Sequence, residues 1–435
     1  MNIAFHTMGC KLNYAETSTI ERSFSKKNYK NVSFKDYADV YIINSCCVTE
    51  NAENEFKYIV RSVKRRNPQS IVIAMGCYAQ YNPKKVSSIY GVDRVLNNDD
   101  KFNIVDIISD INVEVKNKKD KKLFYSSFSF GKRTRSFLKI QDGCNYKCSY
   151  CIIPFSRGKS ISDRIENISK NINFLLKNGI KEIVLTGVNI GDYRGTNNKG
   201  KIYNFFELIQ YIEQYIIENI NIENIRIRLS SIEPNLLKDE LIEFLSKSKY
   251  FVPHFHIPLQ SGNNFLLGKM QRRYQRELYE NKINKIRNLI PNAYIGSDVI
   301  VGFPGETYNH FLDTYFFLKK LDISYMHIFT YSSRPNTKSI NFLEQIPNNI
   351  KRKRNKILKI LSNKKYYSFC KEQIKTKKTV LFEKQSKNKP FLYGYTENYI
   401  RTKIFDPYLK YENSMQNVIL LEIDKNGVIL VESFH

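Results

Sequence analysis

Short apolar runs alternate with amphipathic stretches along the first hundred residues. Strands are predicted at residues 3–7, 40–44, 70–75 and 92–96. Helices are predicted between them, at residues 14–27 and 51–66. The Asn67-Pro68 pair ends the second helix. Because strands that alternate with helices are typical of a parallel sheet covered by helices, residues 1–112 are predicted to form an α/β domain.

The same alternation resumes after a polar segment rich in lysine and serine, residues 113–136, which is expected to be a linker. Strands are predicted at residues 137–140, 182–186, 225–229, 254–259, 294–301 and 325–330. Helices are predicted near residues 163–178, 203–218, 236–248, 274–289 and 307–320. Six strand–helix repeats predict a full or partial (β/α) barrel over residues 137–362, with an active site at the carboxyl ends of the strands.

The end of the chain has a third pattern. Residues 350–378 predict a basic helix that directs Ile357, Leu358, Leu361 and Phe369 inward. Short β-like runs follow at residues 379–382, 391–396, 399–402, 417–423 and 427–431. Five short strands suit a small OB-like β-barrel over residues 370–435, a class that commonly binds oligonucleotides.

Positive charge is concentrated near this last segment. The net charge is +27, and residues 351–390 hold 15 basic and 2 acidic side chains. This favours a polyanionic partner bound with salt-dependent affinity. The alternative is a solvated face in a chain biased towards lysine and asparagine. On the first interpretation, alanine at Lys351, Arg352, Lys353 and Arg354 should weaken that binding.

Three tyrosines of the predicted small barrel, Tyr393, Tyr395 and Tyr399, have two interpretations. They could stack on the bases of a nucleic acid. Equally, they could belong to the core.

The sequence gives no sign of export or of membrane insertion. No apolar run reaches the roughly 18 residues that a spanning helix needs, and the N-terminus lacks the pattern of a signal peptide. A cytoplasmic protein without a membrane partner is therefore expected. In that compartment thiols normally stay reduced, so disulfides are not expected.

Cys144, Cys148 and Cys151 form a C-x3-C-x2-C run directly after the predicted strand at 137–140. A [4Fe–4S] cluster normally takes four cysteines. With three protein ligands, one iron keeps an open position for a chelating small molecule. A structural zinc site would need a fourth ligand at suitable spacing, and the next histidine is His254.

Three more cysteines, Cys10, Cys46 and Cys77, each follow one of the first three predicted strands. The carboxyl ends of parallel strands lie on one edge of a sheet, so these thiols can converge there and are predicted to bind a second cluster. The alternative is ordinary packing of buried cysteines. Cys47 lies beside Cys46, and sequence logic leaves open which of the two binds. Cys370, in the basic helix, is interpreted as a packing residue.

The run at 144–151 resembles the signature of radical S-adenosylmethionine (SAM) enzymes, C-x3-C-x-aromatic-C, with Tyr150 as the aromatic residue. The resemblance implies that SAM chelates the open iron through its amino and carboxylate groups. It also implies that an electron from the cluster splits SAM into methionine and a 5′-deoxyadenosyl radical. The protein would then supply orientation and shielding.

The loops after the predicted barrel strands contain glycines, which permit close approach of a ligand, and side chains that can hydrogen-bond to SAM. Together they should line one rim. The residues predicted to contact the cofactor are Tyr150, Thr186, Gly187, Ser230, Glu233, Gln260 and Gly302.

The three parts together resemble the methylthiotransferase family over essentially the whole chain. Residues 151–154 (Cys-Ile-Ile-Pro), Arg157-Gly158 and residues 394–399 strengthen the match. The resemblance implies a flavodoxin-like N-terminal domain, a radical SAM partial barrel and a TRAM-like RNA-binding barrel. It also selects Cys46 as the ligand.

Residues 9–17 look most like the branch that acts on N6-threonylcarbamoyladenosine beside the tRNA anticodon. The alternatives within the family are the branch acting on N6-isopentenyladenosine and the branch acting on an aspartate of a ribosomal protein. Outside this reaction, the chain could be another SAM-cleaving enzyme, such as a radical SAM methylase. It could also be an RNA-binding iron–sulfur protein without activity.

The implied reaction uses two [4Fe–4S] clusters, with Cys144, Cys148 and Cys151 as the catalytic set. One SAM methylates a sulfur at the second cluster, and another SAM is cleaved. The radical removes the C2 hydrogen of the adenine, and methylthio couples there. The implied partners are the anticodon stem–loop of tRNA, with the target nucleotide splayed out, an electron donor such as flavodoxin or ferredoxin, and a sulfur donor.

Overall fold

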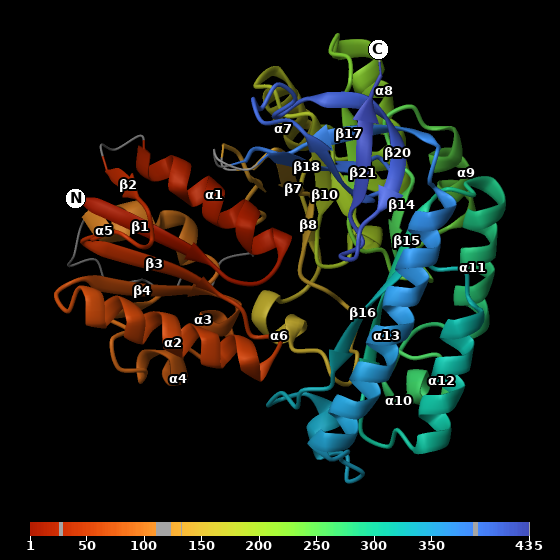
Figure 1. Cartoon of the computed structure of the whole chain (residues 1–435). Coiled ribbons are helices and arrows are strands. Elements are labelled where there is room, and N and C mark those ends of the chain that lie inside the picture. Colours follow the sequence, from red (N-terminus) through yellow and green to blue (C-terminus); the bar gives the residue numbers. More distant parts are fainter. Residues whose placement is uncertain (26–28, 110–122, 132, 386–389, 435) are drawn as a thin grey trace.

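The computed structural model describes residues 1–25, 29–109, 123–131, 133–385 and 390–434. Three parts are visible in Figure 1. An α/β domain from the N-terminus lies beside a larger barrel of strands and helices, and a small β-barrel from the C-terminus covers one end of the larger one. This arrangement confirms the fold class predicted from the sequence.

The N-terminal domain is built on a parallel sheet. In spatial order its strands are β2 (Lys30–Val32), β1 (Asn2–Thr7), β3 (Val40–Ser45), β4 (Ile71–Gly76) and β5 (Arg94–Val95). β2 was not predicted, because three exposed or half-buried residues carry no apolar signal. Helices cover both faces of the sheet, which explains why every residue of β3 is buried.

Two apolar clusters lie on the two sides of this sheet. On one side the sheet packs against α1 (Lys11–Ser25) and α5 (Ile104–Ser109). On the other side it packs against α2 (Glu50–Arg66), α3 (Cys77–Tyr81) and α4 (Pro83–Ser87). α1 was predicted at 14–27, and the end of that prediction lies outside the described residues.

Six parallel strands form the larger barrel. They are β7 (Arg135–Lys139), β10 (Glu182–Thr186), β13 (Arg226–Leu229), β14 (His254–His256), β15 (Tyr294–Val301) and β16 (Tyr325–Thr330). β7, β10 and β13 pair in one sheet and β14, β15 and β16 in another, and the bridges Ile227 to Phe251 and Ser231 to His256 join the two. Among the described residues β7 and β16 do not pair, so the barrel is a partial one.

Helices cover the outside of these strands. They are α7 (Ile165–Lys177), α8 (Phe205–Asn219), α9 (Asp239–Lys247), α11 (Arg276–Leu289) and α12 (Tyr308–Lys320). β14 is shorter than predicted, since Pro258 cannot donate a strand hydrogen bond. Along the edge of β16 runs the long helix α13 (Asn348–Glu372), as Figure 1 shows.

The small barrel is closed. Its strands, in spatial order, are β17 (Lys377–Phe382), β18 (Phe391–Thr396), β19 (Arg401–Phe405), β21 (Ile429–Ser433) and β20 (Met415–Ile423). α13 ends earlier than predicted, before Lys375, which has a φ of +67°. β19 begins later than predicted, because Tyr399 has a φ of +66°. Leu358, Leu361 and Phe369 are buried, as predicted.

The predicted linker at 113–136 falls partly outside the described residues. Within its described part, β6 (Ser127–Phe128) pairs antiparallel with β7. The Phe128 amide donates to Thr19 Oγ1 at 3.1 Å, and the Phe130 amide donates to Ser18 Oγ at 3.0 Å. This segment therefore packs the barrel against α1 of the N-terminal domain.

Several sequence predictions about single side chains can be compared with the structure. Cys370 is fully buried in the core of the small barrel, as predicted. Tyr395 and Tyr399 stack on each other, with ring centroids 4.8 Å apart. The Arg135 guanidinium lies 4.7 Å from the Tyr395 ring, and that of Arg228 lies 4.6 Å from the Tyr399 ring. These two tyrosines therefore join the small barrel to the larger one. In the described part of the chain, no helix is both long and apolar enough to cross a membrane.

Candidate active site

The loop that carries Cys144, Cys148 and Cys151, here called the loop cysteines, lies between β8 (Gln141–Asp142) and α6 (Ile153–Arg157). Gly143 has a φ of +71°, and a Cβ there would lie 2.1 Å from the Lys159 carbonyl oxygen. The Cys144 amide donates to the Gly158 carbonyl at 3.0 Å, which closes the loop. The glycine is therefore needed for the three thiols to share one short segment.

Burial raises the pKa of the Cys144 thiol to about 11 and that of Cys151 to about 12. Burial also raises the pKa of Cys148, against the opposing charge of Arg272. Without a metal these thiols are protonated, and coordination of a metal would deprotonate them.

Arg272 is the functional residue that the sequence analysis missed. Its guanidinium donates to Cys148 Sγ at 3.2 Å and to the Tyr150 hydroxyl at 3.3 Å, and it forms an ion pair with Glu233. The side chain is 3% exposed. One sequence signal could have indicated it: Arg272 and Arg273 are consecutive arginines on a loop that follows the predicted strand at 254–259.

A cavity of about 340 Å³ opens at the carboxyl ends of the barrel strands. The loop cysteines and three predicted cofactor residues, Tyr150, Glu233 and Gln260, line it. Four predicted cofactor residues do not line it: Thr186, Gly187, Ser230 and Gly302. Gly187 and Gly302 instead pack closely against Gln141 and Lys351.

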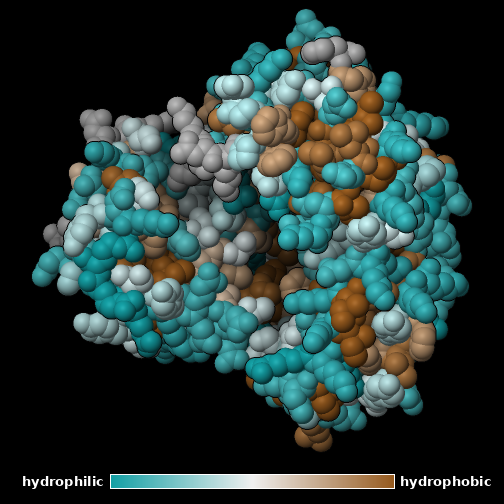
Figure 2. Space-filling view, viewed as in Figure 1, coloured by the Kyte–Doolittle hydropathy of each residue, from teal (hydrophilic) through white to brown (hydrophobic). Residues whose placement is uncertain are grey.

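The N-terminal domain contributes to the same cavity. Val48 and Thr49, which come directly after Cys46 and Cys47, form part of its wall. Figure 2 shows this side of the molecule hollowed between the two domains, with apolar side chains at depth. The cavity therefore extends from the loop cysteines to the edge of the N-terminal sheet.

Cys10, Cys46 and Cys77, here called the sheet cysteines, follow the neighbouring strands β1, β3 and β4. Gly9 has a φ of +90°, and a Cβ there would lie 3.1 Å from Cys46 Sγ. The Asn13 amide donates to the carbonyls of Met8 (2.8 Å) and Ser45 (3.2 Å), which ties two of the loops together. The structure thus brings the three predicted residues to one point at the edge of the sheet.

The structure also distinguishes Cys46 from Cys47. Cys47 is fully buried in the apolar cluster beneath the sheet. Its thiol donates a hydrogen bond to Cys77, and this bond lowers the pKa of Cys77 to about 6. Cys46 is half-buried and interacts electrostatically with both Cys10 and Cys77. Cys46 is therefore the better placed of the two to share a metal group with them.

A buried ion network lies between the two cysteine sets. The Arg157 guanidinium is 3.2 Å from a Glu16 carboxylate oxygen and 2.9 Å from one of Asp142. Lys101 and Lys139 also bind Glu16, at 2.7 and 3.1 Å. Burial alone would raise the pKa of Glu16, but the charges of Arg157, Lys101 and Lys139 hold it well below its usual range.

The three cations of this network face two carboxylates, so the network carries one net positive charge. The charge of Arg157 acts on all three sheet cysteines. A positive environment favours thiolates and an anionic metal group. The residues present therefore fit an iron–sulfur cluster at the sheet cysteines.

The spacing of the sulfurs bears on the zinc alternative. Three thiolates on one zinc ion, at 2.3 Å each, lie about 3.8 Å apart. Over the described ranges of the chain, the one group whose ligand atoms lie within 4.8 Å of one another is His256, Asp298 and His327. Neither cysteine set belongs to a group of that tightness among the described residues.

The His256, Asp298 and His327 group lies on the inner side of β14, β15 and β16. His256 Nε2 is 3.1 Å from Asp298 Oδ1, and its Nδ1 is 2.7 Å from Ser231 Oγ. Ser231 and Asp298 both line the cavity. These side chains give the cavity a polar floor that can hydrogen-bond to a ligand.

Two family models match the chain: the Radical SAM superfamily over residues 138–318, and a family described as Uncharacterized protein family UPF0004 over residues 2–97. Among solved structures, the radical SAM methyltransferase TsrM from Kitasatospora setae matches with a TM-score of 0.55 and 12% identity, over 75% of this chain and 72% of that one. This likeness supports the fold.

Curated relatives are much more similar in sequence. The threonylcarbamoyladenosine tRNA methylthiotransferase MtaB of Aquifex aeolicus is 40% identical, over 85% of this chain and 90% of its own. That of Bacillus subtilis is 36% identical, over 92% and 89%. The tRNA-2-methylthio-N(6)-dimethylallyladenosine synthase of Clostridium tetani is 32% identical, over 88% and 85%. The chain belongs to the methylthiotransferase family of radical SAM enzymes.

Proposed function

We propose that this protein replaces the C2 hydrogen of N6-threonylcarbamoyladenosine, next to the anticodon of tRNA, with a methylthio group. The observation that carries the proposal is the single cavity lined both by the loop cysteines and by residues that directly follow Cys46 and Cys47. A carbon atom held in this cavity would lie beside the loop cysteines and beside the segment that follows Cys46. The relatives from Aquifex aeolicus and Bacillus subtilis are named for this nucleoside.

The dimethylallyladenosine branch is the second candidate, because relatives named for it cover 88% of the chain at 32% identity. The ribosomal aspartate remains a third. Both use the same pair of cysteine sets, so the choice depends on the groups that contact the substrate.

The loop cysteines would hold the [4Fe–4S] cluster that binds SAM, and Cys10, Cys46 and Cys77 would hold a second cluster. When bound, these groups supply the one-electron chemistry that an unactivated carbon requires, together with a sulfur to transfer. The chain itself positions and shields them. Arg272 fixes Cys148 and Glu233, and Ile300, Phe329 and Tyr331 help to wall the cavity against water.

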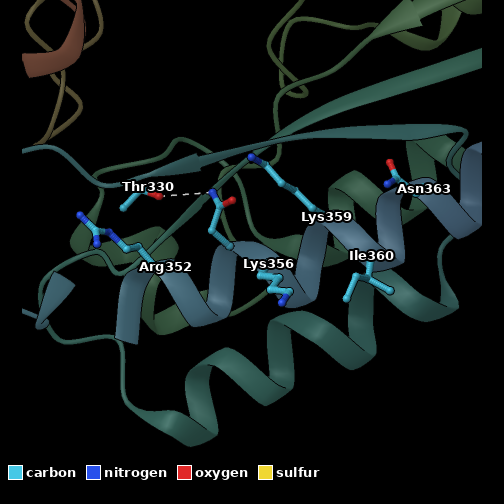
Figure 3. Close-up of a pocket in the computed structure, with 7 residues that line it drawn as sticks. Thr330, Arg352, Lys356, Lys359, Ile360 and Asn363 are labelled. Carbon is cyan, nitrogen blue, oxygen red and sulfur yellow. Dashed lines mark hydrogen bonds between the residues drawn. The ribbon is translucent and has the colours of Figure 1, made fainter. Parts of the chain in front are cut away.

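The tRNA is proposed to contact the exposed face of α13. A second, shallow pocket there is lined by Arg352, Lys356 and Lys359, as Figure 3 shows. Thr330 lines both this pocket and the active-site cavity. The basic face therefore begins beside the active site, where it can bind the phosphates flanking a splayed-out nucleotide.

The sequence predicts that four cations at residues 351–354 contact a polyanionic partner. For two of them this prediction is wrong. Lys351 and Arg354 are only 6% and 7% exposed. Arg354 forms an ion pair with Glu306 at 2.5 Å, and the Lys351 ammonium lies 3.4 Å from the Tyr331 carbonyl oxygen. Helical periodicity turns these two inward, so they stabilise the barrel and are not free to contact RNA.

The remaining partners follow from the chemistry. An electron donor such as flavodoxin or ferredoxin and a donor of sulfur are proposed, because the proposed reaction consumes an electron and a sulfur atom. The reaction is proposed to take place in the cytoplasm, where tRNA is available.

The test is an anaerobic incubation of the reconstituted protein with SAM, a reductant and tRNA that carries threonylcarbamoyladenosine without methylthio. Mass spectrometry of the nucleosides should then show the 2-methylthio product together with 5′-deoxyadenosine. Product only from isopentenyladenosine-containing tRNA would assign the second branch. Methylation without sulfur insertion would indicate a radical SAM methylase. Absence of both product and 5′-deoxyadenosine would favour an RNA-binding protein without this activity.

A further inference from the structure

Phe329 lies near the carboxyl end of β16 and lines the active-site cavity, where the residue is 46% exposed. The next residue, Thr330, lines both this cavity and the shallow basic pocket on α13. Asn355 of α13 donates a hydrogen bond to the Thr330 hydroxyl at 3.2 Å (Figure 3). The end of β16 therefore separates the two pockets.

The other aromatic rings that line the cavity are already in contact with neighbours. The Arg273 guanidinium lies 4.0 Å from the centroid of the Tyr146 ring. The rings of Tyr150 and Tyr331 both pack against Phe303, with centroids 6.3 and 5.5 Å apart. These three tyrosines are thus held by the protein itself.

Phe329 differs from them. Within the described ranges of the chain, no second ring stacks on it, no cation lies over it, and it belongs to none of the buried apolar clusters. A half-exposed aromatic ring with a free face is a stacking surface for a flat ligand. Phe329 offers that surface inside the cavity.

The surroundings of Phe329 suit a nucleotide. The pocket on the other side of Thr330 is lined by Arg352, Lys356 and Lys359, which can bind phosphate. Among the described residues β16 pairs only with β15, so its other edge is open. Proteins that hold single-stranded nucleic acid combine a basic groove for the backbone with aromatic rings for the bases. One nucleotide at this edge can therefore place its base on Phe329 and its phosphate towards α13.

We propose that the target adenine of the tRNA, once splayed out of the anticodon loop, stacks on the ring of Phe329. This inference rests on the proposed function and names the side chain that holds the base. Stacking uses the face of the adenine ring, which is the same in both candidate nucleosides. The contribution of Phe329 should therefore not depend on the N6 substituent.

The test is a set of affinities measured on the cluster-loaded protein without reductant, so that no turnover occurs. The probes are two anticodon stem–loop RNAs, one with threonylcarbamoyladenosine at the target position and one with an abasic ribose there. Phe329→Ala should weaken binding of the first RNA about 5- to 150-fold and leave binding of the abasic RNA unchanged. Phe329→Tyr keeps a stacking ring and should bind both RNAs as the wild type does.

The matched control is Phe316→Ala, which removes an exposed ring from the outer helix α12 and should leave both affinities unchanged. The iron content of each variant is measured first. If Phe329→Ala loses its clusters, Phe329→Leu replaces it, because leucine keeps apolar bulk without a flat face. Phe329→Leu should then bind the first RNA more weakly than Phe329→Tyr does.

Three results would overturn the inference. The first is a Phe329→Ala protein that binds the first RNA as tightly as the wild type. The second is an equal loss of affinity for both RNAs, which would mean that Phe329 only shapes the cavity. The third is weaker binding of SAM with unchanged RNA affinities, which would place the ring against the adenine of the cofactor.

These affinities are separate from turnover. If no methylthio product forms, the proposed reaction fails, while the stacking is still decided by the two RNAs. If product forms but Phe329→Ala binds both RNAs as the wild type does, the reaction stands and the role of Phe329 fails. An RNA with isopentenyladenosine should show the same loss as the threonylcarbamoyl RNA, whichever branch is correct.

Discussion

Glu16→Gln is expected to loosen the contact between the N-terminal domain and the barrel. The Glu16 side chain is fully buried and binds Arg157, Lys101 and Lys139 within 3.2 Å. Glutamine keeps the shape but removes the charge, so three buried cations would remain with Asp142 as their one carboxylate. Breaking a buried ion pair by removing one partner costs about 3–5 kcal/mol.

This cost should appear as easier local opening. Arg157 and Lys139 belong to the barrel, whereas Glu16 and Lys101 belong to the N-terminal domain, so the network fastens one to the other. Native-state hydrogen exchange of the α1 amides should become about 200- to 5,000-fold faster in Glu16→Gln. Glu240→Gln, which changes an exposed carboxylate on α9, should leave that exchange unchanged.

An α1 exchange rate that stays within about threefold of the wild type would refute this reasoning. It would mean that Asp142 and solvation by water are sufficient to stabilise the three cations. The network would then contribute little to the alignment of the two cysteine sets.

The pKa of Glu16 is lower in the folded protein than in the unfolded chain, where it is about 4.3, so the same contact is sensitive to acid. The stability that the Glu16 carboxylate contributes is present above the unfolded pKa and is lost as the pH falls through the lower folded pKa. Exchange of α1 should therefore accelerate below about pH 4 in the wild type but not further in Glu16→Gln. Alanine at Arg352, Lys356 and Lys359 should lower tRNA affinity and reduce the slope of log affinity against log salt by up to about one per charge removed. As a control, alanine at the exposed lysines of α7 should change neither the affinity nor the slope. Arg272→Gln removes a charged donor to Cys148 Sγ and should lower the midpoint potential of the loop cluster by about 60 mV, measured by a redox titration followed by electron paramagnetic resonance. An unchanged salt slope would contradict the proposed tRNA contact of Arg352, Lys356 and Lys359. An unchanged potential would contradict the proposed effect of Arg272 on the loop cluster.

Local patterns were sufficient for the strands of the barrel and for the convergence of the sheet cysteines. Both depend on apolar runs and on the rule that parallel strands end at one edge of a sheet. The sequence could not choose between Cys46 and Cys47, because the choice depends on which thiol turns into the core beneath the sheet.

Contacts between side chains that are far apart in the sequence could not be predicted from local sequence patterns either. Arg354 is buried because Glu306, 48 residues away, binds it. Arg272 acts on a cysteine 124 residues before it. Charge counted along the sequence therefore overestimated the number of exposed cations on α13, and the residue that fixes Cys148 was missed.

The most direct measurement of the central claim is the iron and sulfide content of three reconstituted proteins. The wild type should hold about eight iron and eight sulfide ions, as two [4Fe–4S] clusters. Cys144→Ala/Cys148→Ala/Cys151→Ala and Cys10→Ala/Cys46→Ala/Cys77→Ala should each keep about four of both. A folded triple variant without any iron, or one that still holds all eight, would contradict the assignment of one cluster to each cysteine set.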